Sequence, residues 1–291
     1  MKERLKLGLP KGSLQEITFS LLNRAGWRFT LSQRSYKPYC DDPEMEALMI
    51  RAQEISLYVE QGILDAGITG WDWVLENGSD VIGVCELVYA KHFMRPVRWV
   101  LAVPEDSDIR CVQDLQGCRI STEVVNITRQ YLKEKNIEAV VEFSWGATEI
   151  KAGLLVDAIV EITETGNSLK ANNLRIVDTV MESTTRLIAN RDAFEDPSKN
   201  QKIQNFARLL QGAIDATDRV GLKMNITNEN LPKLIAILPA MKTPTISHLY
   251  NGSGAAVEVI VKEETVRDII PELIKVGATD IIEYPLNKVI P

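Results

Sequence analysis

The sequence predicts an α/β fold made of two lobes and a smaller C-terminal module. Apolar, strand-like runs alternate with amphipathic segments over most of the chain, which is the pattern of α/β proteins. A new series of this kind starts after Pro104 and indicates a second lobe. The last residues, about 75 of them, instead follow the order βαββαβ, which is typical of a small regulatory or binding domain.

Length and composition agree with this class. The chain has 291 residues, 45% hydrophobic and 25% charged, which is ordinary for a folded protein with sizeable cores. Its formal net charge is 33 − 40 = −7, so nucleic acid and anionic membranes are not expected partners. No run of about 18 uncharged apolar residues occurs, and the charged N-terminus lacks the apolar stretch of a signal peptide. We therefore expect a cytoplasmic protein without a membrane span.

The first lobe is expected to open with a buried strand and a helix. Ser13 and Glu16 have the spacing of a capping box, and Gly26 is a plausible helix stop. The expected elements are, in order, a strand over Leu5–Leu9, a helix from Ser13 to Gly26, a short helix over Ile55–Gln61 and a strand over Leu64–Thr69.

The second lobe is predicted from Val97–Val103, a strongly apolar strand that ends at Pro104. The expected elements after it are a short helix ending at Gly117, a strand over Cys118–Ser121, a helix over Asn126–Glu134, and strands over Ala139–Phe143 and Asp157–Ile162. Thr184–Asn190 is interpreted as a segment that returns to the first lobe, and Asp192–Asp218 as mostly helical.

The C-terminal module is expected to hold four strands and two helices. Its strands are predicted over Val220–Ile226, Thr245–Leu249, Ala255–Val261 and Asp280–Tyr284, and its helices over Asn228–Leu238 and Glu263–Val276. The predicted boundaries assign residues 1–98 plus 184–216 to lobe I, 99–183 to lobe II and 217–291 to the module.

The segment from Asp157 to Leu169 carries the most chemical information. A buried strand runs into a short loop, Thr165-Gly166-Asn167-Ser168, at an expected helix start, where backbone N–H groups lack helical partners. Gly166 permits close approach, and the hydroxyl groups add donors, so the loop suits a phosphate monoester. Glu161 lies near the carboxyl end of the strand, where a carboxylate can accept hydrogen bonds from a ribose diol. The alternative is an ordinary capping turn with a solvated glutamate.

Seven motifs occur in a fixed order along nearly the whole chain. They are Gly8-Leu9-Pro10-Lys11-Gly12-Ser13-Leu14, Tyr58-Val59-Glu60-x-Gly62, Asp65-Ala66-Gly67-Ile68-Thr69-Gly70-x-Asp72, Arg119-Ile120-Ser121-Thr122-Glu123, Trp145-Gly146-Ala147-Thr148-Glu149, Asp157-Ala158-Ile159-Val160-Glu161 and Pro244-Thr245-Ile246. Together with the loop, they resemble the long form of the ATP phosphoribosyltransferase family, which performs the first step of histidine biosynthesis.

The resemblance implies a fold and a reaction. The fold would be two lobes like those of type II periplasmic binding proteins, with a ferredoxin-like or ACT-like C-terminal domain. Ring nitrogen 1 of the adenine of ATP would attack the anomeric carbon of phosphoribosyl diphosphate and release pyrophosphate, with Mg²⁺ as the cofactor and its protein ligands unassigned. Histidine would act as a feedback inhibitor, and the chain would assemble from homodimers into a hexamer.

The same resemblance assigns residues to the phosphoribosyl diphosphate site. Glu164, Thr165, Gly166, Asn167 and Ser168 would hold the 5-phosphate, with Asp157 and Leu169 at the ends of the motif, and Glu161 would hold the ribose hydroxyls. Glu161 departs from the usual aspartate of the family, and the family often has threonine where this chain has Ser168.

Further residues are implied for ATP and for catalysis. Lys11, Arg51 and Asp72 are the candidate catalytic residues, and the candidate ATP-binding residues are Lys11, Arg51, Gly70, Asp72, Arg98 and Glu149. Solvated or structural roles remain alternatives for each of these side chains. Trp71, Trp73 and Trp145 are interpreted as core or lobe-packing residues rather than as base-stacking platforms. The histidine effector is assigned to Thr245, Ile246 and Ser247.

The residues favour a mechanism without a strong base. The sequence has two histidines, His92 and His248, and His248 falls in the module. Positioning of adenine and stabilisation of the leaving pyrophosphate would therefore supply the catalysis. The rival hypotheses are a catalytically silent, amino-acid-sensing regulatory subunit, a solute-binding protein, and a type I phosphoribosyltransferase, which normally has two adjacent acidic residues before the loop.

Overall fold

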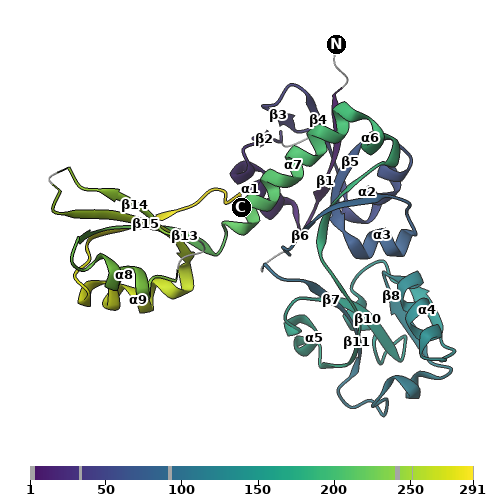
Figure 1. Ribbon diagram of the computed structural model, residues 1–291. Coiled ribbons are helices and arrows are strands. Elements are labelled where there is room, and N and C mark those ends of the chain that lie inside the picture. Colours follow the sequence, from purple (N-terminus) through teal and green to yellow (C-terminus); the bar gives the residue numbers. More distant parts are fainter. Residues whose placement is uncertain (1–3, 33–34, 91–93, 240–242, 251, 291) are drawn as a thin grey trace. The chain divides into compact units, whose positions relative to one another are not determined.

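The structure is a computed structural model, and it describes residues 4–32, 35–90, 94–239, 243–250 and 252–290. The chain divides into two compact units, Met1–Ala207 and Arg208–Pro291. The first unit contains two five-stranded sheets and the second a four-stranded sheet (Figure 1). No helix among the described residues is both long and apolar enough to cross a bilayer.

The first lobe is built on a sheet with the strand order β4-β1-β5-β12-β6. Strands β4, β1 and β5 run parallel, and β12 lies antiparallel between β5 and β6. The strands are β1 (Leu5–Lys11), β4 (Met45–Arg51), β5 (Ala66–Gly70), β6 (Ile82–Leu87) and β12 (Thr185–Ala189). The helices are α1 (Gln15–Ala25), α2 (Ala52–Glu60), α3 (Trp71–Asn77) and α6 (Arg191–Glu195), and β2 (Phe29–Thr30) pairs with β3 (Tyr39–Cys40).

The second lobe repeats this arrangement with the order β9-β8-β10-β7-β11. Here β9, β8 and β10 are parallel, and β7 is the antiparallel strand inserted before the edge strand β11. The strands are β7 (Val97–Pro104), β8 (Arg119–Thr122), β9 (Val140–Phe143), β10 (Ala158–Thr163) and β11 (Leu174–Ser183). The helical elements are η1 (Val112–Leu115), α4 (Val125–Glu134), η2 (Thr148–Lys151) and α5 (Asn167–Ala171).

Strand β12 confirms the predicted return of the chain to the first lobe. It follows β11 of the second sheet but pairs with β5 and β6 of the first. Leu187, Ile188 and Ala189 are fully buried there, which accounts for the apolar sequence of the segment. The predicted α/β class with two lobes is thus confirmed.

The C-terminal unit has the strand order β14-β15-β13-β16, with every pair antiparallel. Its elements are β13 (Arg219–Thr227), α8 (Leu231–Ile237), β14 (Thr245–His248), β15 (Gly254–Lys262), α9 (Glu263–Lys275) and β16 (Thr279–Pro285). The apolar face of the sheet packs with α8 and α9 around Leu222, Met224, Leu234, Val257 and Leu273. This arrangement confirms the predicted ferredoxin-like βαββαβ domain. The long helix α7 (Pro197–Asp215) spans the boundary between the two units.

Several local features differ from the prediction. Strands β4, β6 and β11 were not predicted, and β11 contains two bulges, after Ile176 and after Thr179, that interrupt its alternation of side chains. The predicted capping box at Ser13 is wrong, because α1 begins at Gln15 after Leu14 and has no side-chain cap. Gly26, in contrast, ends α1 in the left-handed conformation, with a φ of 109°.

Candidate active site

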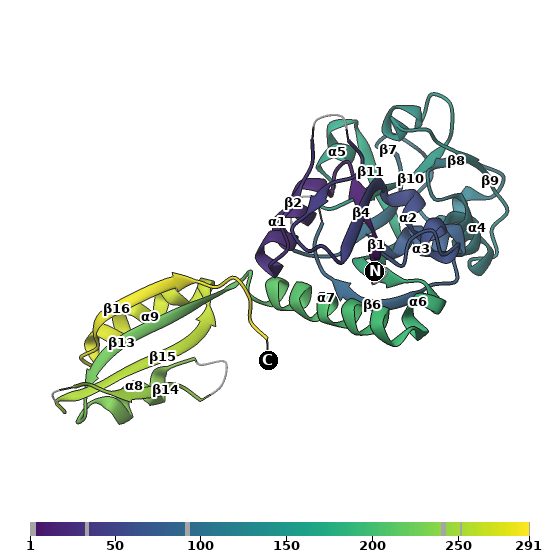
Figure 2. The ribbon, with the colours of Figure 1, turned by 90° about the horizontal axis from the view of Figure 1, so that it is seen from above.

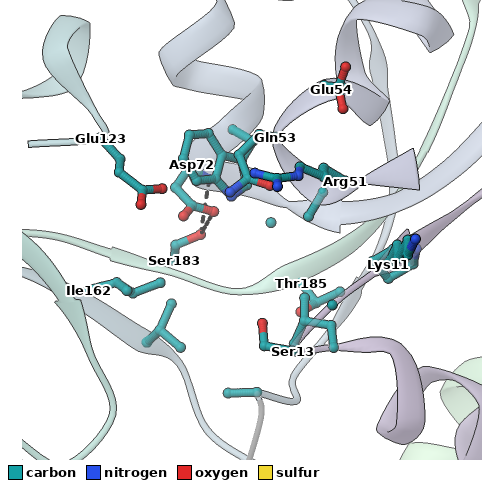
Figure 3. Close-up of a pocket in the computed structure, with 18 of the residues that line it drawn as sticks. Lys11, Ser13, Arg51, Gln53, Glu54, Asp72, Glu123, Ile162, Ser183 and Thr185 are labelled. Atoms are coloured by element: carbon teal, nitrogen blue, oxygen red, sulfur yellow. Dashed lines mark hydrogen bonds between the residues drawn. The ribbon is translucent and has the colours of Figure 1, made fainter. Parts of the chain in front are cut away.

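A cavity of about 960 Å³ lies between the two lobes of the first unit, and residues of both lobes line it (Figure 3). Its walls come largely from the carboxyl ends of parallel strands: β1, β4 and β5 in lobe I and β8 and β10 in lobe II. Ligands of open α/β sheets bind at such ends. Both lobes therefore present their ligand-binding edges to one space.

On the lobe I side, each of two neighbouring strands has a cationic residue at its carboxyl end. Lys11 is the last residue of β1, Arg51 is the last residue of β4, and the two are partners in the parallel register. Both line the cavity, and both are drawn in Figure 3. The Lys11 ammonium lies 4.1 Å from the centroid of the Tyr36 ring, in a cation–π contact. Two like charges side by side at a cavity wall favour an anionic ligand.

Asp72, the third catalytic candidate, is held by protein groups. Its side chain is 2% exposed. Oδ2 accepts a hydrogen bond from Trp99 Nε1 at 2.8 Å. Oδ1 accepts one from Ser183 Oγ at 2.9 Å (Figure 3). Burial raises the pKa of Asp72, and these two hydrogen bonds oppose the rise. Gly70 lines the cavity beside it, and a Cβ there would lie 2.1 Å from Asp72 Oδ1, which explains the glycine.

Glu161 is the main carboxylate on the lobe II side. It lies in β10, lines the cavity, and has its pKa raised to about 7. Burial is the largest cause; a hydrogen bond from Thr148 lowers the pKa, and the charges of Glu149 and Glu123 raise it. Glu123 follows β8, whose last residue pairs with the residue before Glu161, and it also lines the cavity. The structure thus supplies a second carboxylate from a neighbouring strand.

The predicted phosphate loop connects β10 to α5. Gly166 has a φ of 80°, and its N–H donates to Thr163 Oγ1 at 2.7 Å. The Ser168 hydroxyl donates to Glu149 at 2.7 Å, so these two candidates are in contact. The side chain of Leu169 is 1% exposed and packs among Val100, Ala102, Ile159 and Leu174, which anchors α5 in the lobe core. Of the loop, Glu164 lines the cavity, whereas Thr165 to Leu169 lie outside its lining.

Besides Thr165 to Leu169, three candidates lie outside the cavity lining: Asp157, Arg98 and Glu149. Asp157 precedes β10, at the amino end of the strand, and its carboxylate accepts a hydrogen bond from the Arg119 N–H at 2.7 Å. Arg98 lies on β7 between Val97 and Trp99; both of these neighbours line the cavity, but Arg98 does not. Arg98 pairs with Thr163 of β10, and Glu161 pairs with Val100, so Arg98 lies on the same face of the sheet as Glu161 although it does not line the cavity. The structure does not bring Asp157 to the other candidates.

Other lining residues were not among the candidates. Those with polar side chains include Ser13, Tyr36, Gln53, Glu123, Ser183 and Thr185. Ser13 and Glu123 fall within motifs of the predicted family, which was an available signal. Ser183 and Thr185 lie where the chain passes from β11 to β12, and no local pattern marks that position.

The tryptophans divide between packing and exposure. Trp73 packs against the core of lobe II and lies edge-on to Trp99, with the ring centroids 6.0 Å apart. Arg186 lies over the ring of Trp71 at 4.3 Å. The interpretation of Trp145 as a core or lobe-packing residue is wrong, because its side chain is 93% exposed in the turn after β9.

The effector candidates lie on one strand of the C-terminal unit. Thr245, Ile246 and Ser247 belong to β14, an edge strand that pairs only with β15 among the described residues, and all three are exposed. His248 ends the same strand. His92 lies outside the described residues.

Among the described residues, no group of three or more histidine, cysteine, aspartate or glutamate side chains is arranged to hold a metal. Glu123 and Glu161 nevertheless offer carboxylate oxygens to the same cavity. Mg²⁺ commonly takes one or two carboxylates together with substrate phosphates and water. The residues present therefore fit a metal that shares its ligands with a bound substrate.

Comparison with known proteins gives consistent results. Residues 51–212 match the family model described as ATP phosphoribosyltransferase, and residues 216–288 match the model described as HisG, C-terminal domain. The ATP phosphoribosyltransferase of Pelotomaculum thermopropionicum is 57% identical over 288 residues, which cover 99% of this chain and 100% of the relative. That of Thermodesulfovibrio yellowstonii is 55% identical over 292 residues, covering 100% of both chains.

A solved structure agrees with these relatives. It is the ATP phosphoribosyl transferase (HisG:HisZ) complex from Thermotoga maritima, with a TM-score of 0.62 and 29% identity, covering 72% of this chain and 98% of that one. The cavity between two α/β lobes, the separate C-terminal domain and these full-length matches lead to one assignment. The chain belongs to the ATP phosphoribosyltransferase family, in the long form that carries a C-terminal domain.

Proposed function

We propose that the cavity between the lobes transfers the phosphoribosyl group of phosphoribosyl diphosphate to ring nitrogen 1 of the adenine of ATP, releasing pyrophosphate. The observation that carries this proposal is the pair of cations, Lys11 and Arg51, facing Glu161 and Glu164 across one cavity at the ends of parallel strands. Polyphosphate and a ribose diol are the ligands that such a charge distribution recognises. Family membership supports the same reaction.

Lys11 and Arg51 are proposed to bind the triphosphate of ATP and the departing pyrophosphate. Tyr36 would hold the Lys11 ammonium in place through the cation–π contact. The backbone of Gly70 borders the same space and leaves room for the nucleotide. Asp72 would act on ATP indirectly, because both of its carboxylate oxygens already accept hydrogen bonds from protein groups.

The phosphoribosyl diphosphate would bind on the lobe II side. Glu161 is proposed to accept hydrogen bonds from the ribose hydroxyls, and Glu164 to Ser168 to surround the 5-phosphate with backbone N–H and hydroxyl donors. Glu149 would orient the Ser168 hydroxyl, as its hydrogen bond does in the structure. Leu169 would anchor the loop in the core. Asp157 and Arg98 would support their strands without contacting substrate.

Catalysis would rest on position and charge rather than on a strong base. The adenine nitrogen is a weak nucleophile, so holding it in line with the anomeric carbon lowers the barrier. Cationic side chains stabilise the charge that develops on pyrophosphate as the C–O bond breaks. Mg²⁺, when bound, would neutralise further charge on the diphosphate, with Glu123 and Glu161 as the carboxylates within reach of the cavity.

Regulation and assembly are proposed on the family resemblance. Residues 1–98 plus 184–216 and 99–183 would act as the catalytic lobes, and residues 217–291 as a domain that binds histidine near Thr245, Ile246 and Ser247. Histidine would inhibit by favouring one arrangement of the chain over another, since coupling requires a difference in affinity. Homodimers that assemble into a hexamer would be the functional form, and the cytoplasm its compartment.

The test is pyrophosphate release from purified protein mixed with ATP, Mg²⁺ and phosphoribosyl diphosphate, with and without histidine. Release that requires both substrates and falls with histidine is expected. Release that ignores histidine would remove the regulatory proposal and keep the catalytic one. No release, with histidine still bound, would instead favour a silent regulatory subunit.

A further inference from the structure

Helix α3 belongs to lobe I by sequence, because it lies between strands β5 and β6 of the first sheet. Its polar side chains, however, reach the second lobe. Asp72 and Glu76 lie four residues apart, so they share one face of the helix. Asp72 contacts the β7 and β11 strands of lobe II, and Glu76 contacts α4 of lobe II.

The Asp72 contact is buried and includes the backbone. The Asp72 N–H donates to Ser183 Oγ at 3.0 Å, in addition to the two hydrogen bonds that the carboxylate accepts. The preceding Trp71 N–H donates to the Thr184 carbonyl at 3.0 Å. Trp73 adds apolar contact with the lobe II core and with Trp99. The first turn of α3 is thereby bound to β7 and to the passage of the chain from β11 to β12.

The Glu76 contact lies at the surface, at the other end of α3. Its Oε1 and Oε2 accept hydrogen bonds from the N–H groups of Asn126 and Ile127, both at 3.0 Å. The Asn126 side-chain amide donates to the Glu76 carbonyl at 2.9 Å. Asn126 and Ile127 belong to the first turn of α4, whose N–H groups lack helical partners and whose dipole favours a carboxylate. Helices α3 and α4 lie side by side in Figures 1 and 2.

We propose that α3 is the joint that sets the two catalytic lobes relative to each other, and that Glu76 is its positioning residue. This inference rests on the proposed function, in which ATP phosphates bind lobe I groups and phosphoribosyl diphosphate binds lobe II groups. Because the reacting atoms are held by different lobes, a loose joint misaligns them without weakening the binding of either substrate. A carboxylate at position 76 is required, since it accepts two N–H groups at once.

Kinetics of two variants and one control test this role. Glu76→Ala is expected to lower the rate constant of a single turnover about tenfold to a hundredfold, as a misplacement of about 1 Å does. Glu76→Gln should fall between, because its amide oxygen accepts hydrogen bonds but its NH₂ group cannot. The dissociation constant of phosphoribosyl diphosphate for the free enzyme should stay within about twofold of wild type. Glu138→Ala removes an exposed carboxylate of lobe II and should change neither quantity.

Amide hydrogen exchange gives a readout that does not depend on activity. The Asn126 and Ile127 amides should exchange faster in Glu76→Ala than in wild type or Glu138→Ala, because they lose their acceptors. Wild-type turnover in Glu76→Ala, a loss of substrate affinity equal to the loss of rate, or unchanged exchange at these amides would overturn the inference. Absence of pyrophosphate release in wild type would instead refute the proposed function, and the exchange measurement would still decide whether Glu76 holds α4.

Discussion

The Ser168 hydroxyl donates a 2.7 Å hydrogen bond to the Glu149 carboxylate and so ties the start of α5 to η2. The two residues are 19 positions apart and belong to separate motifs. In η2, Thr148 also hydrogen-bonds Glu161. The loop proposed for the 5-phosphate and the carboxylate proposed for the ribose are therefore supported by one short segment.

Substitution of Gly166 by aspartate should abolish binding at the phosphate loop. The residue has a φ of 80°, so any side chain adds strain of about 1–2 kcal/mol, and aspartate adds a negative charge where a phosphate is proposed. We expect the dissociation constant of phosphoribosyl diphosphate to rise at least about a hundredfold, which is about 2.7 kcal/mol, measured by titration calorimetry.

The matched control is Gly117→Asp. Gly117 has a φ of 77°, and a Cβ there meets nothing within 4 Å, so the backbone strain is similar while the position lies before β8, outside the proposed phosphate loop. This variant should keep wild-type affinity. A Gly166→Asp protein that binds phosphoribosyl diphosphate as tightly as Gly117→Asp does would contradict the assignment of the loop.

Loss of the Lys11 ammonium should reduce kcat/KM more than loss of the Tyr36 ring that contacts it. Lys11→Gln removes one of the two cations at the strand ends, and kcat/KM should fall about a hundredfold, as for other groups that stabilise transition-state charge. Tyr36→Leu removes only the cation–π contact, worth about 0.5–1 kcal/mol, so a loss of about two- to fivefold is expected. Tyr36→Phe should retain activity.

Lys6→Gln is the control for the lysine change. Lys6 is exposed at the other end of the same strand, β1, and lies outside the cavity lining. Steady-state pyrophosphate release gives kcat/KM for each variant. Equal losses for Lys6→Gln and Lys11→Gln would show that the effect comes from general charge rather than from the cavity.

Glu161 should make stability depend on pH. Burial raises its folded pKa to about 7 from an ordinary value of 4.5, so the folded state holds this proton more tightly than the unfolded state does. The stabilisation of the folded state by this proton is fully present below about pH 4.5 and is lost as the pH rises through 7. Glu161→Gln, which stays neutral, should therefore be more stable than wild type at pH 8 by about 2–3 kcal/mol.

At pH 4.5 the two proteins should be nearly equally stable. Urea unfolding of the ligand-free proteins at both pH values measures the difference, and Glu138→Gln serves as an exposed control whose stability should follow wild type. A stability difference between Glu161→Gln and wild type that is the same at both pH values would mean that the carboxyl of Glu161 does not titrate as proposed.

Histidine inhibition should weaken when the proposed effector strand is altered. Thr245→Ala removes an exposed hydroxyl from β14, and the histidine concentration for half inhibition should rise about tenfold, within the usual range of allosteric coupling. Activity without histidine should stay at the wild-type level. Thr279→Ala removes an exposed hydroxyl from β16, at the opposite edge of the sheet, and should leave inhibition unchanged.

Much of the site could be predicted from the sequence, because a short stretch of residues is enough to identify a strand and its carboxyl end. An apolar run followed by a loop identifies the carboxyl end of a strand, and Lys11, Gly70 and Glu161 were placed in that way. The alternation of strands and helices similarly predicted both lobes and the βαββαβ domain. Strands β4 and β6 escaped prediction because charged residues and glycine interrupt their apolar pattern, as Glu46 and Gly83 do.

What remained undetermined depends on which segments pack together. The register of β1 with β4 puts Arg51 beside Lys11, and the register of β8 with β10 puts Glu123 beside Glu161. Asp72 accepts a hydrogen bond from Ser183, 111 residues later in the chain. This contact buries a side chain that the sequence indicated as a catalytic candidate. Hydrophobic periodicity and helix stops act over a few residues, so the chain encodes its elements locally. Neighbouring carboxylates, paired cations and the contact between lobes arise only when burial of apolar surface selects one packing of those elements.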